Sequence, residues 1–160
     1  MITFNADEIF EIAEQIERNG AKFYRKAAEP AEGANKDLLL RLAAMEDDHE
    51  KTFVEMRAEL AAGEKQPTVF DPDDEAVLYL QAAADGKVFG ADPSEALSGA
   101  EAMKDILTIA VSLEKDSIVF YQSMKAVVPA AAGLEKLDDI IKQEIGHILD
   151  LTKQLEALAA

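Results

Sequence analysis

The chain has 160 residues, 49% of them hydrophobic, which is enough for a core of its own, and we expect a single domain over residues 1–160. Its 16 Lys and Arg against 32 Asp and Glu give a formal net charge of −16, which disfavours nucleic acid and anionic membrane surfaces as partners. Cysteine is absent, which excludes disulfides, thiolate metal sites and iron–sulfur clusters. We see neither a membrane span of roughly 18 apolar residues nor a secretion signal, and expect a cytoplasmic protein.

Two amphipathic helices are predicted in the first half of the chain. The first covers residues 6–29, with Asn5 as its N-cap and Pro30 directly after its end. The second covers residues 36–62, with Asn35 as the capping residue before it and with a glycine and a proline beyond its end. These start and stop signals indicate a helical hairpin.

The middle of the chain is predicted to be a long connector that leads into a third helix. Residues 64–99 are rich in Pro, Gly and Asp, and within them residues 73–84 have the pattern of a short extra helix. Ser98 and Glu101 have the spacing of a capping box, and an apolar helical period follows as far as Val128.

Residues 131–158 form the fourth predicted helix, and nothing in the chain has the pattern of a strand. Helices of about 24 to 28 residues would each be about 36 to 42 Å long, which is typical of a long bundle. We therefore predict an all-α protein, a four-helix bundle made of two helical hairpins.

Each predicted helix has one inward-facing stripe, because residues spaced alternately three and four apart share a face. These stripes are largely apolar, as at Leu137, Ile140, Leu151 and Leu158 of the fourth helix, but polar near their middles. There the second and fourth helices each carry a Glu-x-x-His pair, and the first and third each carry one Glu. The six residues are Glu17, Glu46, His49, Glu114, Glu144 and His147.

An internal repeat relates the two halves of the chain. Ile-Glu-Arg-Asn-Gly-Ala-Lys-Phe-Tyr at 16–24 parallels Leu-Glu-Lys-Asp-Ser-Ile-Val-Phe-Tyr at 113–121. The two glutamates of each half are also similarly spaced, since 46 − 17 is 29 and 144 − 114 is 30. The repeat predicts two hairpins related by a pseudo-twofold axis.

Two interpretations of these polar residues compete. A single His on an apolar stripe is usually a satisfied core residue, and a single Glu usually faces water. Four buried carboxylates with no Lys or Arg on their stripes would, however, cost several kcal/mol each or be forced to protonate. Two divalent ions would bring a charge of +4 against −4. The pattern therefore predicts a two-metal site.

This pattern resembles the rubrerythrin-type members of the ferritin-like di-iron carboxylate superfamily, whose ligands are one Glu from each of two helices and a Glu-x-x-His from each of the other two. The resemblance covers all four predicted helices. It implies that the single glutamates each bind mainly one iron, that the glutamates of the Glu-x-x-His pairs bridge both, and that each histidine completes one coordination sphere.

The resemblance extends to two tyrosines and breaks down at two features. Tyr24 and Tyr121, seven residues after the single Glu of each half, resemble tyrosines that neighbour the family's iron ligands, which implies a catalytic role for them, although simple core packing explains them equally well. Ser117 stands where typical rubrerythrins have a further Glu, which makes the centre more symmetric, as in bacterioferritin. The Cys-rich rubredoxin domain of typical rubrerythrins has no counterpart here, so electrons must come from a separate donor.

The function implied by the resemblance is that of a di-iron oxidoreductase, which reduces peroxide or oxidises ferrous iron with dioxygen. An external donor such as a rubredoxin would supply electrons, and the protein would be a homodimer. Carboxylate and imidazole ligands suit two iron ions per chain, and they also suit Mn or Zn. A non-catalytic iron-binding or storage protein and a redox-inert zinc-loaded bundle remain alternatives.

Overall fold

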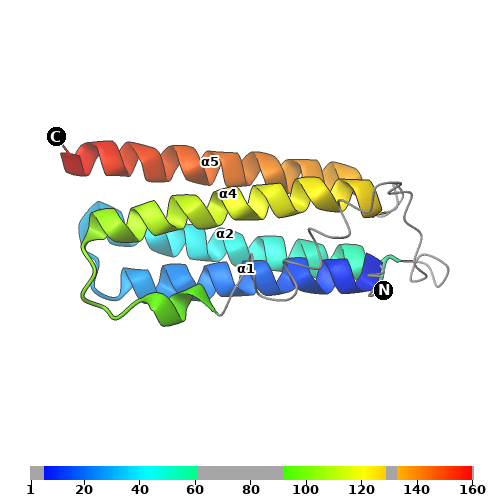
Figure 1. Cartoon of the computed structure of the whole chain (residues 1–160), viewed down its shortest axis with the longest axis horizontal. Coiled ribbons are helices and arrows are strands. Elements are labelled where there is room, and N and C mark those ends of the chain that lie inside the picture. Colours follow the sequence, from blue (N-terminus) through cyan, green and yellow to red (C-terminus); the bar gives the residue numbers. More distant parts are fainter. Residues whose placement is uncertain (1–5, 61–91, 129–132, 160) are drawn as a thin grey trace.

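Four long helices lie side by side in the computed structural model, which describes residues 6–60, 92–128 and 133–159 (Figure 1). They are α1 (Ala6–Ala28), α2 (Gly33–Ala58), α4 (Met103–Val127) and α5 (Leu134–Ala159), and a short 3₁₀ helix, η1 (Pro93–Ala96), precedes α4. Helices α1 and α2 form one antiparallel hairpin and α4 and α5 form another, whereas α2 and α4 run in the same direction. The described residues contain no strand, and the predicted all-α four-helix bundle is confirmed.

The start of α2 differs from the prediction. The helix begins at Gly33, whose φ of 52° lies in the left-handed region that glycine tolerates, so the glycine makes the turn into the helix. Asn35 is therefore not its N-cap but lies in its first turn, where Oδ1 accepts a hydrogen bond of 2.7 Å from Nε2 of Gln154 on α5. The helix ends at Ala58, four residues earlier than predicted.

The predicted capping box before α4 exists but does not cap the helix. The backbone N–H and the hydroxyl of Ser98 donate to Oε1 of Glu101 over 2.8 and 2.6 Å. The helix begins only at Met103, and Ala102 at its N-cap makes no side-chain capping hydrogen bond. Gly99, with a φ of 85°, keeps the box out of helical geometry, so the predicted helix start was wrong.

Other predictions lie partly outside the described residues. The predicted N-cap Asn5 and the predicted short helix at 73–84 fall there, and the single domain over 1–160 stays a prediction. Among the described residues, α5 begins at Leu134 instead of 131, because Gly133, with a φ of 90°, lies outside helical geometry. No described helix is long and apolar enough to cross a membrane.

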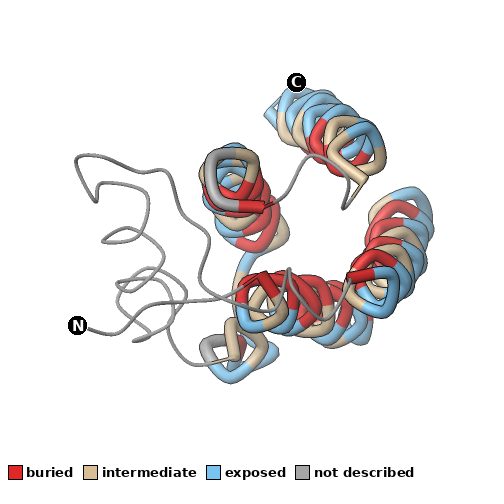
Figure 2. Tube along the Cα trace, turned by 90° about the vertical axis from the view of Figure 1, so that its right-hand side faces the viewer, coloured by how far each residue is buried: buried red, intermediate tan, exposed pale blue. Residues whose placement is uncertain are grey.

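The buried faces of the four helices turn toward one another (Figure 2). They form two apolar clusters, one built around Phe10, Phe53 and Phe120 and the other around Leu39 and Leu107. The first cluster takes residues before Glu17 on α1, and the second takes residues after it, so a polar layer separates the two. The predicted stripes are buried almost throughout, but Leu158 near the end of α5 is 44% exposed, which corrects its predicted place in the core.

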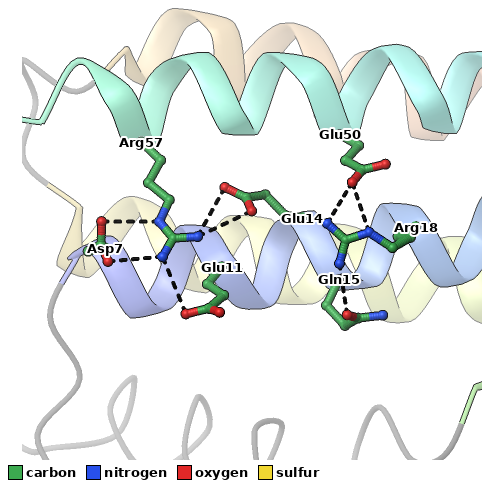
Figure 3. Close-up of polar contacts among 7 residues, drawn as sticks. All are labelled: Asp7, Glu11, Glu14, Gln15, Arg18, Glu50 and Arg57. Carbon is green, nitrogen blue, oxygen red and sulfur yellow. Dashed lines mark hydrogen bonds and ion pairs between the residues drawn. The ribbon is translucent and has the colours of Figure 1, made fainter.

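Ion pairs fix α1 against α2 (Figure 3). Arg57 of α2 pairs with Asp7 over 3.0 Å and with Glu14 over 3.2 Å, and Arg18 of α1 pairs with Glu50 over 2.6 Å. Because these contacts sit at different heights along the hairpin, they oppose sliding of one helix along the other. They thus help to hold the polar residues of α1 opposite those of α2.

Arg57→Ala should lower the free energy of unfolding by about 2 kcal/mol, because Glu14, only 7% exposed, would lose the ion-pair partner that the structure shows for it. Arg25→Ala is the matched control, since its pair with Asp47 is more exposed and should be worth about 0.5 kcal/mol. Urea unfolding of both variants measures the difference. Equal losses of unfolding free energy in the two variants would show that the burial of Glu14 adds nothing to the stabilisation by its ion pair with Arg57.

Candidate metal centre

The structure brings the six polar residues of the stripes into one layer, between the two apolar clusters. Each of the four helices contributes to it, and none of the six residues is more than 4% exposed. The layer contains Glu17 from α1, Glu46 and His49 from α2, Glu114 from α4, and Glu144 and His147 from α5.

These residues form two overlapping groups, in each of which the potential ligand atoms lie within 4.8 Å of one another. One group contains Glu17 and His49, the other contains Glu114 and His147, and both contain Glu46 and Glu144. Oxygen and nitrogen ligands about 2.1 Å from one ion lie up to about 4.2 Å apart, so each group is close to the size of a single coordination shell. The two shared carboxylates are placed where they could bridge two ions.

Several atoms of the layer are buried without a hydrogen bond among the described residues. The two carboxylate oxygens of Glu144 lie 3.0 Å from Nδ1 of His49 and 2.9 Å from Nδ1 of His147, yet none of these atoms has a hydrogen-bond partner. Oε1 of Glu46 is also without one. An unsatisfied buried polar atom costs about 1–3 kcal/mol. Carboxylate oxygens and imidazole nitrogens that gather this closely, several of them without a hydrogen bond, are arranged as ligands of a shared ion, so the residues fit a metal.

The electrostatics of the layer are unfavourable without a cation. Burial and the charge of Glu144 raise the pKa of Glu114 to about 8, and burial together with nearby carboxylates raises the pKa of Glu46 well above its usual value. Burial lowers the pKa of both imidazoles, but the carboxylates around them outweigh it and raise the pKa of His49 to about 11 and of His147 to about 9. Without a metal the layer therefore retains protons at neutral pH, and ions that bind must displace them.

The two tyrosines contact the layer reciprocally. The hydroxyl of Tyr24 on α1 donates to Glu114 on α4, and the hydroxyl of Tyr121 on α4 donates to Glu17 on α1. Their rings are buried on opposite sides of the layer, one in each apolar cluster. Core packing and contact with the candidate ligands are thus both realised, and a catalytic role of the tyrosines stays a prediction.

Two small residues occupy equivalent positions one turn after the single glutamates. A Cβ on Gly20 would lie 3.2 Å from Oε2 of Glu46, so the absence of a side chain leaves room for that carboxylate. The hydroxyl of Ser117, at the position where typical rubrerythrins have a further Glu, donates to the carbonyl of Leu113 over 3.0 Å within its own helix. Ser117 therefore brings no carboxylate to the layer.

One residue that the sequence did not single out also touches the layer. Oε1 of Gln143 on α5 lies 3.1 Å from Nε2 of His49 on α2. Its only sequence signal is its position directly before Glu144. Exposed glutamines are common on helices, so the contact became evident only from the packing of α5 against α2.

Comparison with known proteins places the fold. No protein-family model matches the chain, and no curated protein matches it. Among solved structures, the chain is similar to a protein of Thermotoga maritima that is provisionally named a ferritin-like diiron-carboxylate protein. The two share 24% sequence identity with a TM-score of 0.71, over 98% of this chain and 97% of that one. The chain therefore has a ferritin-like four-helix fold, with a cluster of Glu and His residues at its centre that could hold metal.

Proposed function

We propose that the protein is a di-iron oxidoreductase of rubrerythrin type, which reduces peroxide or oxidises ferrous iron at its Glu/His layer. The observation that carries this proposal is the pair of overlapping ligand groups that share Glu46 and Glu144. The buried atoms without hydrogen bonds in that layer support it, and so does the diiron-carboxylate name of the similar Thermotoga maritima protein.

The residues divide into three roles in this proposal. Glu46 and Glu144 would bridge the ions, Glu17 with His49 would complete one position, and Glu114 with His147 would complete the other. The ligand types suit iron, and Mn or Zn could occupy the same positions. Bound iron would supply two electrons, one from each ferrous ion.

Other side chains would control the surroundings of the ions. The hydroxyls of Tyr24 and Tyr121 hold one carboxylate each and so limit how far Glu114 and Glu17 can swing. The apolar clusters above and below the layer exclude bulk water, which strengthens electrostatic interactions inside it. Peroxide takes up two electrons and two protons to form two waters, and these protons would have to come from outside the ligands, because ions that bind displace the protons of the metal-free layer.

Anaerobic single turnover tests the proposal. Iron-loaded, chemically reduced protein should consume one hydrogen peroxide for every two ferrous ions and then stop, because two Fe(II) supply the two electrons that peroxide needs. Adding a reduced rubredoxin with its reductase should restore continuous turnover, since the chain has no cysteine for a relay of its own. Continuous turnover with ferrous ion and dioxygen alone would instead identify a ferroxidase.

Metal-free protein and Glu144→Gln protein serve as controls, and neither should react above the rate of free iron. Reduced, iron-loaded protein that resists both peroxide and dioxygen would contradict the redox function. It would favour a protein that stores or delivers iron. Tightly bound zinc that iron does not displace would favour the redox-inert bundle.

A further inference from the structure

The two histidines of the layer differ in what contacts their outer ring nitrogen, Nε2. Nε2 of His49 faces the side-chain carbonyl oxygen of Gln143 at 3.1 Å. Because an amide oxygen only accepts hydrogen bonds, this contact holds a ring proton on Nε2, so Nδ1 is the nitrogen that can bind an ion once the ion displaces its proton. Nδ1 is also the atom that lies nearest the shared carboxylate Glu144, at 3.0 Å. The ring is thus held in the tautomer and orientation that a metal ligand needs.

His147 lacks such support among the described residues. Its Nε2 is buried without a hydrogen-bond partner, although its Nδ1 lies 2.9 Å from Glu144. The residue directly before the Glu of each Glu-x-x-His pair is Gln143 in one half of the chain and Met45 in the other, so the first half has no amide at the position equivalent to Gln143. A thioether is only a weak acceptor.

The two rings are otherwise alike. They are equally buried and stack with 5.6 Å between their centroids and 18° between their planes. The two imidazoles therefore differ in the hydrogen-bond partner of Nε2. A hydrogen bond to the outer nitrogen of a metal-binding His fixes the ring and raises its basicity, and its loss typically weakens metal affinity by about 10- to 100-fold.

We infer that the two ion positions are unequal, and that the position completed by His49 binds its ion first and more tightly because Gln143 positions that imidazole. This inference rests on the proposed two-metal centre. It makes Gln143 a positioning residue, which acts through His49 and does not itself touch an ion.

Zinc binding to the metal-free full-length protein tests the inference without any turnover. The chain has only two histidines, so the ring nitrogens of each can be followed separately by NMR, while calorimetry gives the affinities. With one Zn²⁺ added per chain, the signals of His49 should shift and those of His147 should not. The second Zn²⁺ should then shift His147 and bind about tenfold more weakly.

Three variants separate positioning from a general structural effect. Gln143→Met, which gives both halves the same residue, should weaken the first zinc about tenfold and abolish the order of filling. Gln143→Glu keeps an acceptor and should retain the order. Gln122→Met, the same change at an exposed position of α4, should bind both ions as the wild type does.

Several results would overturn the inference. They are equal affinities in the wild type, first occupancy at His147, wild-type behaviour of Gln143→Met, and loss of the filling order in Gln143→Glu. Two equal zinc ions would remove the inequality and leave the two-metal centre intact. A wild-type protein that binds no zinc at this layer would overturn both.

Discussion

Glu144→Ala protein should lose nearly all of both metal ions, whereas His147→Ala protein should retain about one. Glu144 belongs to both ligand groups, and its two oxygens face one histidine each, so its removal opens both coordination spheres. His147 belongs to only one group. Elemental analysis after iron loading and dialysis, with protein concentration measured independently, gives the number of ions per chain. Glu46→Ala should resemble Glu144→Ala for the same reason.

Glu156→Ala is the matched control, because it removes an exposed carboxylate from the same helix and should leave the metal content unchanged. Circular dichroism should show that all the variants keep their helices. If the Glu144 and His147 variants contained equal amounts of metal, the two carboxylates would not be bridging ligands. The assignment of ligands to the two positions would then have to be revised.

Removal of the metal should lower the melting temperature by on the order of 10 °C. Ions at concentrations far above their dissociation constants stabilise the folded state by several kcal/mol, and this free energy sets the temperature shift for a chain of this length. Calorimetry of metal-free and iron-loaded protein at pH 7 gives the difference. A melting temperature unaffected by metal removal would contradict a buried cluster of ligands that needs cations.

The metal-free protein should also lose stability as the pH rises from about 5 to about 8. The folded-state pKa of Glu114 is raised to about 8 from 4.5, so the folded state holds its proton more tightly than the unfolded chain, and this advantage disappears as the pH passes through that interval. The raised pKa of His147, about 9 against 6.5, acts in the same direction at higher pH. Stability of the metal-free form that increased with pH over this range would contradict these shifts.

Iron-loaded protein should show the opposite trend. Its ligands must be deprotonated to hold the ions, so acidification weakens metal binding and removes the stabilisation that the ions provide. Melting temperatures of both forms measured in one series of buffers should therefore converge toward low pH. Parallel curves would indicate that the ions bind elsewhere.

The helical period of the sequence was enough to identify the inward faces. Residues three and four apart must share a face, so Glu46 with His49 and Glu144 with His147 were placed correctly on their helices before any packing was known. The reciprocal contacts of Tyr24 and Tyr121 likewise follow the repeat. Both the helical period and the internal repeat are visible in the amino-acid sequence itself, so they indicate these positions without knowledge of how the helices pack.

Features that depend on contacts between helices could not be predicted in this way. Asn35 was expected to cap a helix, but its side chain bonds to Gln154 across the bundle instead. Gln143 could not be distinguished from other exposed glutamines, because its partner His49 lies on a different helix. Which ions bind, and what they react with, depends on ligand and oxidant chemistry that neither the period nor the fold specifies.

Anomalous scattering from crystals of iron-loaded protein tests the two-metal centre most directly. Data collected on both sides of the iron edge should show two peaks per chain, about 3.5 to 4 Å apart as in other two-metal sites. Both peaks should lie within bonding distance of Glu46 and Glu144, one beside His49 and the other beside His147. A single peak in this layer, or iron only at the acidic surface, would contradict the centre proposed for this bundle.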